Sequence, residues 1–264
     1  MNKYLKNSST YFYILIRHWN AFEYFDTCLS SVLAQTYDQY KILFVDDASL
    51  YSKRQRDYIR QKLKGHVVIF NGIRKYAVRN AFEILRKYAD NPDGVVVNLD
   101  GDDWFFNNSV LNTLNQIYIH TNVCLTFGNC VVWNGEKYQH LGMVPKLSSL
   151  NRSYSAAVIK NNSYRFEPFL PLHPRTWKVW LFQRIKKIDF LRPDGSWLQF
   201  AEDQAIFYPM LEMAAGRFKA ISKPLSVYNM TTANSDVKIN TFNLIRDELI
   251  VRKKTPYAKL NAFL

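Results

Sequence analysis

The N-terminal part of this chain alternates between short apolar runs and longer amphipathic segments. Apolar runs rich in aromatic and β-branched residues occupy residues 11–16, 41–45, 66–70 and 95–99. Such runs are typical of buried strands. Amphipathic segments at residues 52–64 and 76–89 lie between them and predict helices. This alternation predicts an α/β fold with a mainly parallel central sheet and helices on both faces.

A further helix is expected between the first two strands. Asn20 and Glu23 have the spacing of an N-terminal capping box. An apolar stripe follows at helical spacing, made of Phe25, Leu29, Val32 and Leu33. The helix is therefore expected to begin at Asn20.

The regular alternation fades after Val131. Prolines interrupt the next stretch, and amphipathic helices are expected at residues 176–186 and 203–215, with a C-terminal helix near Thr241. No linker or internal repeat separates the two halves. The chain is therefore expected to be a single domain, in which residues 135–264 form a lobe on the same core as residues 1–134.

Length and composition indicate a globular protein. A chain of 264 residues, 48% of them hydrophobic, can bury a sizeable core. No apolar run approaches the roughly 20 residues of a membrane-spanning helix, and the polar start lacks the apolar centre of a secretory signal. A cytoplasmic location is expected, or the host cytoplasm or virion for a viral protein. The cysteines Cys28, Cys124 and Cys130 form no CxxC pair and are expected to be buried, reduced thiols.

The formal net charge of +13 will attract polyanions in general. The basic residues are nevertheless dispersed along the chain, and the densest group falls on the predicted helix at residues 52–64. Such a run is more typical of a solvated helix face than of a binding stripe. Nucleic-acid binding is therefore not expected.

Acidic residues follow two of the predicted strands. Ligands bind at the carboxyl ends of strands in open α/β sheets, and the two acidic groups there are Asp46-Asp47 and Asp100-Gly101-Asp102-Asp103. Neighbouring carboxylates repel one another and favour a hard divalent cation such as Mg²⁺ or Mn²⁺, which can also bridge a diphosphate. A solvated acidic turn is the alternative interpretation of the second group.

Taken in order, these segments resemble the inverting glycosyltransferases of family two, which have the GT-A fold. The resemblance covers about residues 11–134, through Asn20-Ala21, residues 28–36, Val45-Asp46-Asp47-Ala48-Ser49 and Leu99-Asp100-Gly101-Asp102-Asp103-Trp104. Later segments at His173-Pro174-Arg175 and Glu202-Asp203-Gln204 look like those of short cytoplasmic or viral-type members. The resemblance implies transfer of a sugar from a UDP-sugar to a hydroxyl of a glycan, protein or small-molecule acceptor. Residues 1–134 would bind the nucleotide-sugar, and residues 135–264 would supply the acceptor side and the catalytic base.

The resemblance also implies roles for individual residues. Contacts to the donor are expected from Asn20, Asp47, Arg79, Asp100, Gly101 and Arg175, with Asp47 at the uracil and Asp100 at the ribose. Asp102 is expected to hold Mn²⁺ or Mg²⁺, with Asp103 and His173 assisting. Asp203 is expected to be the general base that takes the proton from the acceptor hydroxyl. The alternative for Asp203 is an ordinary acid at a helix N-terminus.

Several features bear on rival functions. The sequence departs from the family at Arg17, where a proline is usual, and it lacks the Gln-x-x-Arg-Trp motif of processive synthases, so single-sugar transfer is expected. A sugar nucleotidyltransferase would need a glycine-rich loop after the first strand, where no glycine occurs. An inactive nucleotide-sugar-binding domain is the other alternative. The aromatics Trp177, Trp180 and Phe182 are expected to form an acceptor platform or a homo-oligomer interface.

Overall fold

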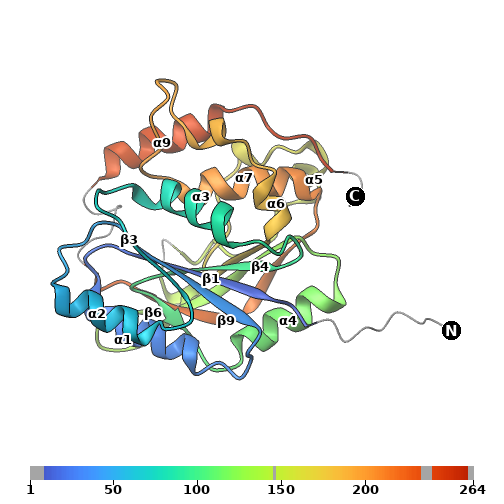
Figure 1. The fold of residues 1–264 in the computed structure, drawn as a ribbon. Helices are drawn as coiled ribbons and strands as arrows, with labels where there is room; N and C mark the ends of the chain where they lie inside the picture. Colours follow the sequence, from blue (N-terminus) through green and yellow to red (C-terminus); the bar gives the residue numbers. More distant parts are fainter. Residues whose placement is uncertain (1–8, 145–146, 233–239, 261–264) are drawn as a thin grey trace.

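The computed structural model describes residues 9–144, 147–232 and 240–260 and shows an α/β fold (Figure 1). The strands are β1 (Phe12–His18), β2 (Tyr40–Asp46), β3 (Val67–Phe70), β4 (Val95–Asp100), β5 (Trp104–Phe105), β6 (Leu125–Trp133), β7 (Tyr138–His140), β8 (Arg175–Lys178) and β9 (Phe218–Asn229). The α-helices are α1 (Phe22–Leu33), α2 (Lys53–Lys62), α3 (Tyr76–Tyr88), α4 (Val110–His120), α5 (Ala156–Asn161), α6 (Val179–Gln183), α7 (Glu202–Ala214) and α9 (Thr241–Lys253). The predicted fold class is confirmed.

One sheet runs through both halves of the chain. Among the described residues its strand order is β3-β2-β1-β4-β8-β6-β9-β5, and β7 pairs with β6. Strands β3, β2, β1 and β4 are parallel, whereas β8 is antiparallel to both β4 and β6. The first four strands of the list therefore form one parallel block, and β6 and β9 form a second parallel pair. Because β8 and β9 extend the same sheet, the chain forms a single domain, and the division at residue 134 stays a prediction.

Alternate side chains of β1 face opposite layers of helices. Tyr13 and Leu15 lie in the hydrophobic core shared with α3 and α7, while Phe12, Ile14 and Ile16 lie in the core shared with α1, α2 and α4. Figure 1 shows these two helical layers on either side of the sheet. A strand covered on both faces has no solvent-facing position, which explains the unbroken apolar run at residues 11–16.

The start of α1 differs from the sequence prediction. The helix begins after Ala21 without a side-chain cap. Asn20 instead has a φ of 49°, a backbone conformation that asparagine tolerates better than most residues, and its Oδ1 accepts a hydrogen bond from the N–H of Leu50. The predicted capping box at Asn20 is therefore wrong. A complete capping box occurs at α2, between Ser52 and Gln55.

The segment expected as a helix at residues 176–186 begins as a strand. β8 pairs with β4 on one side and β6 on the other, and helix α6 follows it. Trp177 and Phe182 are both 1% exposed, and Trp180 packs against the same core. Because Trp177 and Phe182 are buried in the core, they cannot form an acceptor platform or an oligomer interface, and that expectation is wrong for both; for the partly buried Trp180 it stays a prediction. Oligomeric state stays a prediction.

Two further expectations concern the cysteines and the membrane. Cys28, Cys124 and Cys130 are all buried and unpaired, as predicted. Within the described residues, every helix is too short or too polar to cross a bilayer.

Candidate active site

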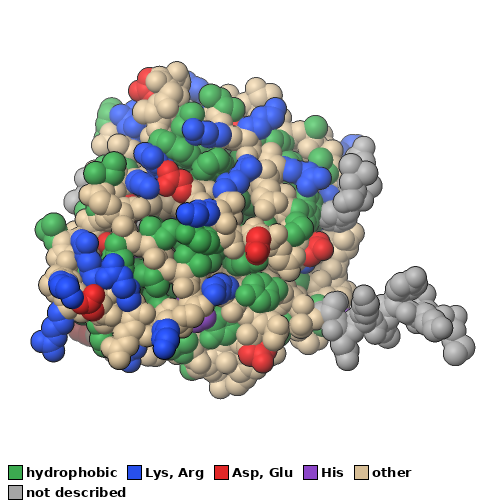
Figure 2. Space-filling model, viewed as in Figure 1, with side chains coloured by type: hydrophobic (Ala, Val, Ile, Leu, Met, Phe, Trp, Pro, Cys, Tyr) green, Lys and Arg blue, Asp and Glu red, His purple; other side chains and the backbone are tan. Residues whose placement is uncertain are grey.

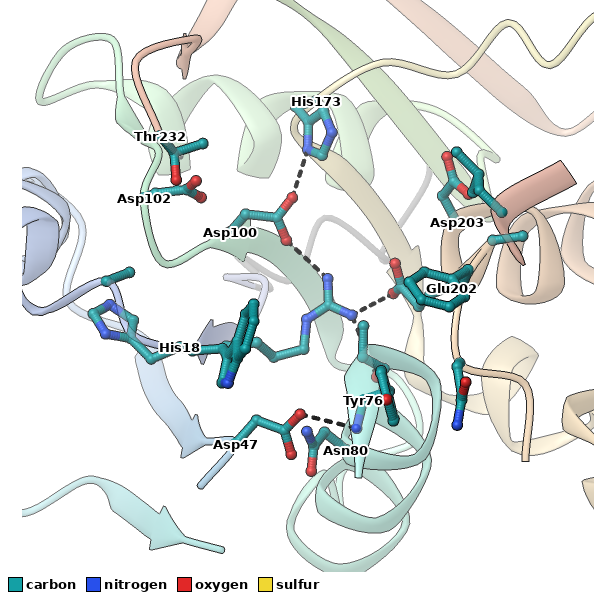
Figure 3. A pocket seen from close by; sticks show the side chains of 18 of the residues that line it. His18, Asp47, Tyr76, Asn80, Asp100, Asp102, His173, Glu202, Asp203 and Thr232 are labelled. Atoms are coloured by element: carbon teal, nitrogen blue, oxygen red, sulfur yellow. Dashed lines mark hydrogen bonds and ion pairs between the residues drawn. The ribbon is translucent and has the colours of Figure 1, made fainter. Parts of the chain in front are cut away.

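A cavity of about 420 Å³ opens at the edge where β1, β2 and β4 end (Figure 3). The parallel register brings these ends together, since Arg17 is paired with both Val45 and Asp100. Residues from both halves of the chain line the cavity, among them Arg17, Asp47, Asp100, Asp102, His173, Arg175, Glu202 and Asp203. The fold therefore gathers most of the predicted site residues around one space.

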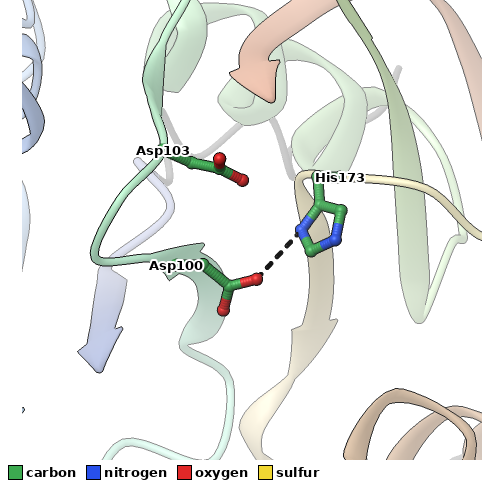
Figure 4. A group of neighbouring side chains, drawn as sticks. All are labelled: Asp100, Asp103 and His173. Atoms are coloured by element: carbon green, nitrogen blue, oxygen red, sulfur yellow. Dashed lines mark ion pairs between the residues drawn. The ribbon is translucent and has the colours of Figure 1, made fainter. Parts of the chain in front are cut away.

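Asp100, Asp103 and His173 form a tight group beside this cavity (Figure 4). Asp100 is the last residue of β4, Asp103 lies on the turn before β5, and His173 precedes β8. One potential ligand atom from each lies within 4.8 Å of the others. Nδ1 of His173 is 3.6 Å from Oδ2 of Asp100, and the imidazole stacks on the ring of Tyr228.

Burial and crowding shift the pKa values in this region. Burial, with the charge of Asp100, raises the pKa of Asp102 to about 6. Burial and the charges of Asp102 and Asp100 also raise the pKa of Asp103 well above its usual value. Burial, with the charge of Arg175, lowers the pKa of His173 to about 4, so its imidazole is neutral near pH 7. A divalent cation would offset the repulsion between these carboxylates and could also bind the neutral imidazole of His173.

The donor atoms of the group fit such a cation. Oδ2 of Asp103 and Nδ1 of His173 are buried, and neither has a hydrogen-bond partner among the described residues. Oδ1 of Asp103 accepts a hydrogen bond from the N–H of Asn229 at 2.8 Å, which fixes the carboxylate. Two of the expected metal ligands, Asp103 and His173, are thus brought together. The third member is Asp100, whereas Asp102 lies nearer to Thr232 (Figure 3).

Arg17 lines the cavity, and its guanidinium lies between the carboxylates of Asp100 and Glu202. Its Nη2 donates a hydrogen bond to Oδ1 of Asp100 at 2.8 Å, and its Nη1 is 2.7 Å from Oε1 of Glu202. The side chain is only 9% exposed. Although burial disfavours its charge, the carboxylates of Glu202 and Asp100 more than offset this and raise the pKa of Arg17. The family position usually held by proline therefore carries a buried cation in this chain.

Glu202 and Asp203 begin α7, and both side chains line the cavity. The side chain of Glu202 is 11% exposed, whereas that of Asp203 is 31% exposed. Oδ2 of Asp203 accepts a hydrogen bond from Nη2 of Arg175 at 3.1 Å. Arg175, expected at the donor, therefore lines the cavity with its guanidinium directed at Asp203. Asp203 is the more accessible of the two acids.

Asp47 lies across the cavity from Asp203 (Figure 3). Its carboxylate accepts hydrogen bonds from the N–H groups of Lys75 at 2.7 Å and Tyr76 at 2.9 Å. These contacts stabilise the start of α3, because a negative charge is favourable at a helix N-terminus. The side chain of Asn71 donates a further hydrogen bond at 3.2 Å.

Planar groups stack beside Asp47. The guanidinium of Arg74 lies 3.4 Å from the ring centroid of Trp19 and 4.4 Å from that of Tyr76. All three residues line the cavity. This side of the cavity offers flat surfaces and a hydrogen-bond acceptor, which suit a planar heterocyclic ring.

Three expected donor residues do not line the cavity. Arg79 lies on a side of α3 that does not line the cavity, where it forms an ion pair with Glu83 at 2.7 Å. The next residue, Asn80, lines the cavity instead. Asn20 is held by its hydrogen bond to the loop at Leu50. Gly101 acts through close packing, since a Cβ there would lie 2.0 Å from the ring of His18.

Sequence reasoning missed several cavity residues. Trp19, Arg74, Tyr228, Thr232 and Glu248 all line it, but none belongs to a recognisable motif, and Tyr228 comes from the end of β9, remote in sequence from the other strands. Arg17 could have been singled out from the sequence, because it stands at a position where the family usually has a proline.

Residues 13–188 match the family model described as glycosyl transferase family 2. No curated protein matches this sequence at a significant level. The match includes β1, β2 and β4, with Asp47 and the acidic turn after β4, and it extends over His173 and Arg175.

Solved structures share the fold at low sequence identity. S. aureus TarS 1–349, in complex with UDP-GlcNAc, superposes with a TM-score of 0.60 at 14% identity, over 85% of this chain and 60% of that one. The mannosyltransferase PcManGT from Pyrobaculum calidifontis, in complex with GDP-Man and Mn²⁺, gives 0.59 at 14% identity, over 95% and 67%. This chain thus spans about 60% of the TarS fragment. Since the family model covers two thirds of the sequence and the fold agrees, the chain belongs to glycosyl transferase family 2.

Proposed function

We propose that this chain is an inverting glycosyltransferase that moves one sugar from a UDP-sugar to an acceptor hydroxyl. The observation that supports this best is the shared cavity. It is lined by Asp47 on one side and Asp203 on the other, with the acidic turn after β4 between them (Figure 3). A transferase needs this separation, because the acceptor must attack from the side opposite the leaving diphosphate.

The donor nucleotide is placed by the residues at the end of β2 and the start of α3. Carboxylate oxygens only accept hydrogen bonds, and Asp47 can therefore accept from the N–H of a uracil. The stacked side chains of Trp19, Arg74 and Tyr76 supply the flat surface for the ring. Asp100, at the end of β4, also lines the cavity and would contact the ribose or the diphosphate.

Asp100, Asp103 and His173 would hold a divalent cation, Mn²⁺ or Mg²⁺. Such an ion supplies charge neutralisation for a departing diphosphate. Asp102 lines the same cavity and adds a further carboxylate beside this group. The solved structure of PcManGT is a complex with GDP-Man and Mn²⁺, which agrees with this choice of metal.

Asp203 is the general base in this proposal. It takes the proton from the acceptor hydroxyl while that oxygen forms its bond to the anomeric carbon, and the bond from that carbon to the diphosphate oxygen breaks. The hydrogen bond from Arg175 orients one carboxylate oxygen. The fractional exposure of 31% leaves the carboxylate accessible to an acceptor.

A panel of nucleotide-sugars tests the donor and the reaction together. We expect UDP-sugars with Mn²⁺ to raise the melting temperature and to yield UDP when an acceptor is supplied. The panel should include UDP-GlcNAc and GDP-mannose. A preference for GDP-mannose would contradict the assigned nucleotide, and the absence of turnover with every donor and acceptor would contradict the reaction.

Calorimetry tests the metal. We expect UDP to bind more weakly in chelator than in Mn²⁺, and His173→Ala to weaken Mn²⁺-dependent UDP binding by at least about tenfold. The exposed His140→Ala serves as the matched control. Unchanged UDP affinity in chelator would remove the metal from the mechanism.

A further inference from the structure

Arg17 lines the cavity and contacts acidic residues from both halves of the chain. It is the next-to-last residue of β1, and the strand register places it directly beside Asp100 of β4. The carbonyl of Arg17 also accepts a hydrogen bond from the N–H of Gly101, the next residue in the acidic turn. The backbone on which this side chain stands is therefore fixed to the acidic turn.

The two oxygens of Asp100 have different neighbours. Oδ1 accepts the hydrogen bond from Nη2 of Arg17, while Oδ2 faces Nδ1 of His173 at 3.6 Å. A carboxylate held by one oxygen cannot rotate freely, so Arg17 determines where the second oxygen points. That second oxygen is directed toward His173, which with Asp103 completes the group that fits a cation (Figure 4).

The other side of the guanidinium reaches α7. Nη1 of Arg17 is 2.7 Å from Oε1 of Glu202, the first residue of that helix and the neighbour of Asp203. Nη1 also lies 3.4 Å from the carbonyl oxygen of Ala77 on α3. One planar group thus contacts the end of β4 and the starts of α7 and α3.

We infer that Arg17 is a positioning residue. It holds the carboxylate of Asp100, which would bind the metal, in a fixed position and orientation relative to the start of α7. This inference rests on the proposed function of the cavity. The rigid fork of the guanidinium is suited to this task because its N–H groups point in fixed directions toward two carboxylates at once. Arg17 acts through Asp100 and Glu202 and takes no part in bond making.

The competing explanation is that Arg17 only balances the negative charge of the two carboxylates. Substitution of Arg17 by lysine distinguishes this explanation from a positioning role. Arg17→Lys keeps the positive charge, but a single ammonium on a flexible stem cannot hold both carboxylates in the same geometry. The matched control is Arg165→Lys, which alters another buried arginine paired with a carboxylate of α7, Glu212, away from the cavity.

The first measurement is the affinity of each protein for Mn²⁺ alone, by calorimetry, beside its thermal unfolding. For Arg17→Lys we expect Mn²⁺ affinity to fall by about 10–100-fold, the usual effect of losing a group that orients a metal ligand. Arg165→Lys should lower the melting temperature and leave Mn²⁺ affinity within about twofold of wild type. Wild-type affinity in Arg17→Lys, or a loss equal to that of Arg165→Lys, would overturn the inference.

A second variant tests the contact with α7 and keeps the inference testable if Arg17→Lys is unstable. Glu202→Ala leaves the Arg17–Asp100 pair intact. We expect it to retain Mn²⁺ affinity and donor KM while kcat falls about tenfold, because the start of α7 loses its tie. A loss of Mn²⁺ affinity as large as in Arg17→Lys, or an unchanged kcat, would contradict the inference. If wild type binds Mn²⁺ but transfers no sugar, the proposed reaction fails while the Mn²⁺ affinities still decide the role of Arg17.

Discussion

At Gly101 the backbone of the acidic turn approaches β1 too closely for a side chain. A Cβ would lie 2.0 Å from the ring of His18 and 2.5 Å from the carbonyl oxygen of Arg17. The His18 ring is itself buried among aromatic neighbours and has little room to move. The glycine is therefore required by packing, and it sets the path of the chain between Asp100 and Asp102.

Gly101→Ala should lower the free energy of unfolding by about 1–3 kcal/mol, the usual cost of overpacking a filled site. It should also weaken Mn²⁺ binding, because the turn that carries the acids must shift. Urea unfolding and calorimetry measure the two effects. Gly142→Ala is the matched control, since nothing lies within 4 Å of a Cβ there. Equal stability of the two variants would contradict this account of the turn.

The sequence predicted single residues unevenly. Asp47 and Asp100 could be placed at the cavity because they lie at the carboxyl ends of predicted strands, whereas Asp203 was identified from the resemblance to the family. The direction in which a helix side chain points is harder to predict from sequence. On α3, Arg79 pairs with Glu83, whereas Asn80 lines the cavity. The pairing of Arg17 with Glu202 could not be predicted, because it depends on how α7 packs against the end of β1.

At the scale of elements, α9 holds the loop that leads into α7. Asp247 on α9 is fully buried and accepts hydrogen bonds from the N–H groups of Gln199 at 3.0 Å and Phe200 at 3.1 Å. Arg192 forms an ion pair with the same carboxylate at 2.7 Å. Since Phe200 lines the cavity two residues before Glu202, α9 supports the geometry of the acids at the start of α7.

Asp247→Asn should destabilise the fold by about 3 kcal/mol at pH 7, because it breaks an ion pair in which Asp247 is fully buried and the side chain of Arg192 is only 12% exposed. Burial raises the pKa of Asp247, but hydrogen bonds from Arg192, Gln199 and Phe200 outweigh it, so the pKa lies below its usual value. The carboxylate therefore stabilises the fold above the unfolded pKa of about 3.9 and loses this effect as the pH falls through the folded value.

Urea unfolding between pH 7 and pH 3 measures this pH dependence. The difference between wild type and Asp247→Asn should be largest at neutral pH and should shrink below about pH 4. The exposed Asp93→Asn is the control and should change stability by less than about 0.5 kcal/mol. A difference that grows on acidification would contradict the assignment.

Most of the elements of the N-terminal half followed the sequence. The apolar runs at 11–16, 41–45, 66–70 and 95–99 predicted strands, and helices were predicted at the positions of α3, α7 and α9. β8 was mistaken for the start of a helix, because Thr176 and Trp177 lie in a short segment whose strand state depends on pairing with β4 and β6. Local pattern cannot reveal pairing between segments so far apart in sequence.

At the scale of the whole molecule, the positive charge is spread over the surface. Figure 2 shows lysine and arginine side chains scattered among apolar and polar groups on one face, with the densest group over α2. Two of the basic side chains on α2, Lys53 and Arg60, form ion pairs with Asp57 on the same helix. The positively charged side chains that line the cavity are Arg17, Arg74 and Arg175.

Nucleic acid should therefore bind only non-specifically. Titration with duplex and single-stranded oligonucleotides at physiological salt should give dissociation constants of about 10⁻⁶ M or weaker. Binding tighter than about 10⁻⁷ M that depends on sequence would contradict this expectation.

The central claim is that Asp203 is the base of an inverting transfer, and single-turnover measurement of Asp203→Asn beside Glu202→Gln tests it most directly. Asp203→Asn should bind UDP-sugar and Mn²⁺ nearly normally yet transfer sugar about 10²–10⁴-fold more slowly, because an amide cannot take the proton. Glu202→Gln should retain most activity, because its amide oxygen still accepts from Arg17. Full turnover in Asp203→Asn, above all with activity abolished in Glu202→Gln, would contradict the account.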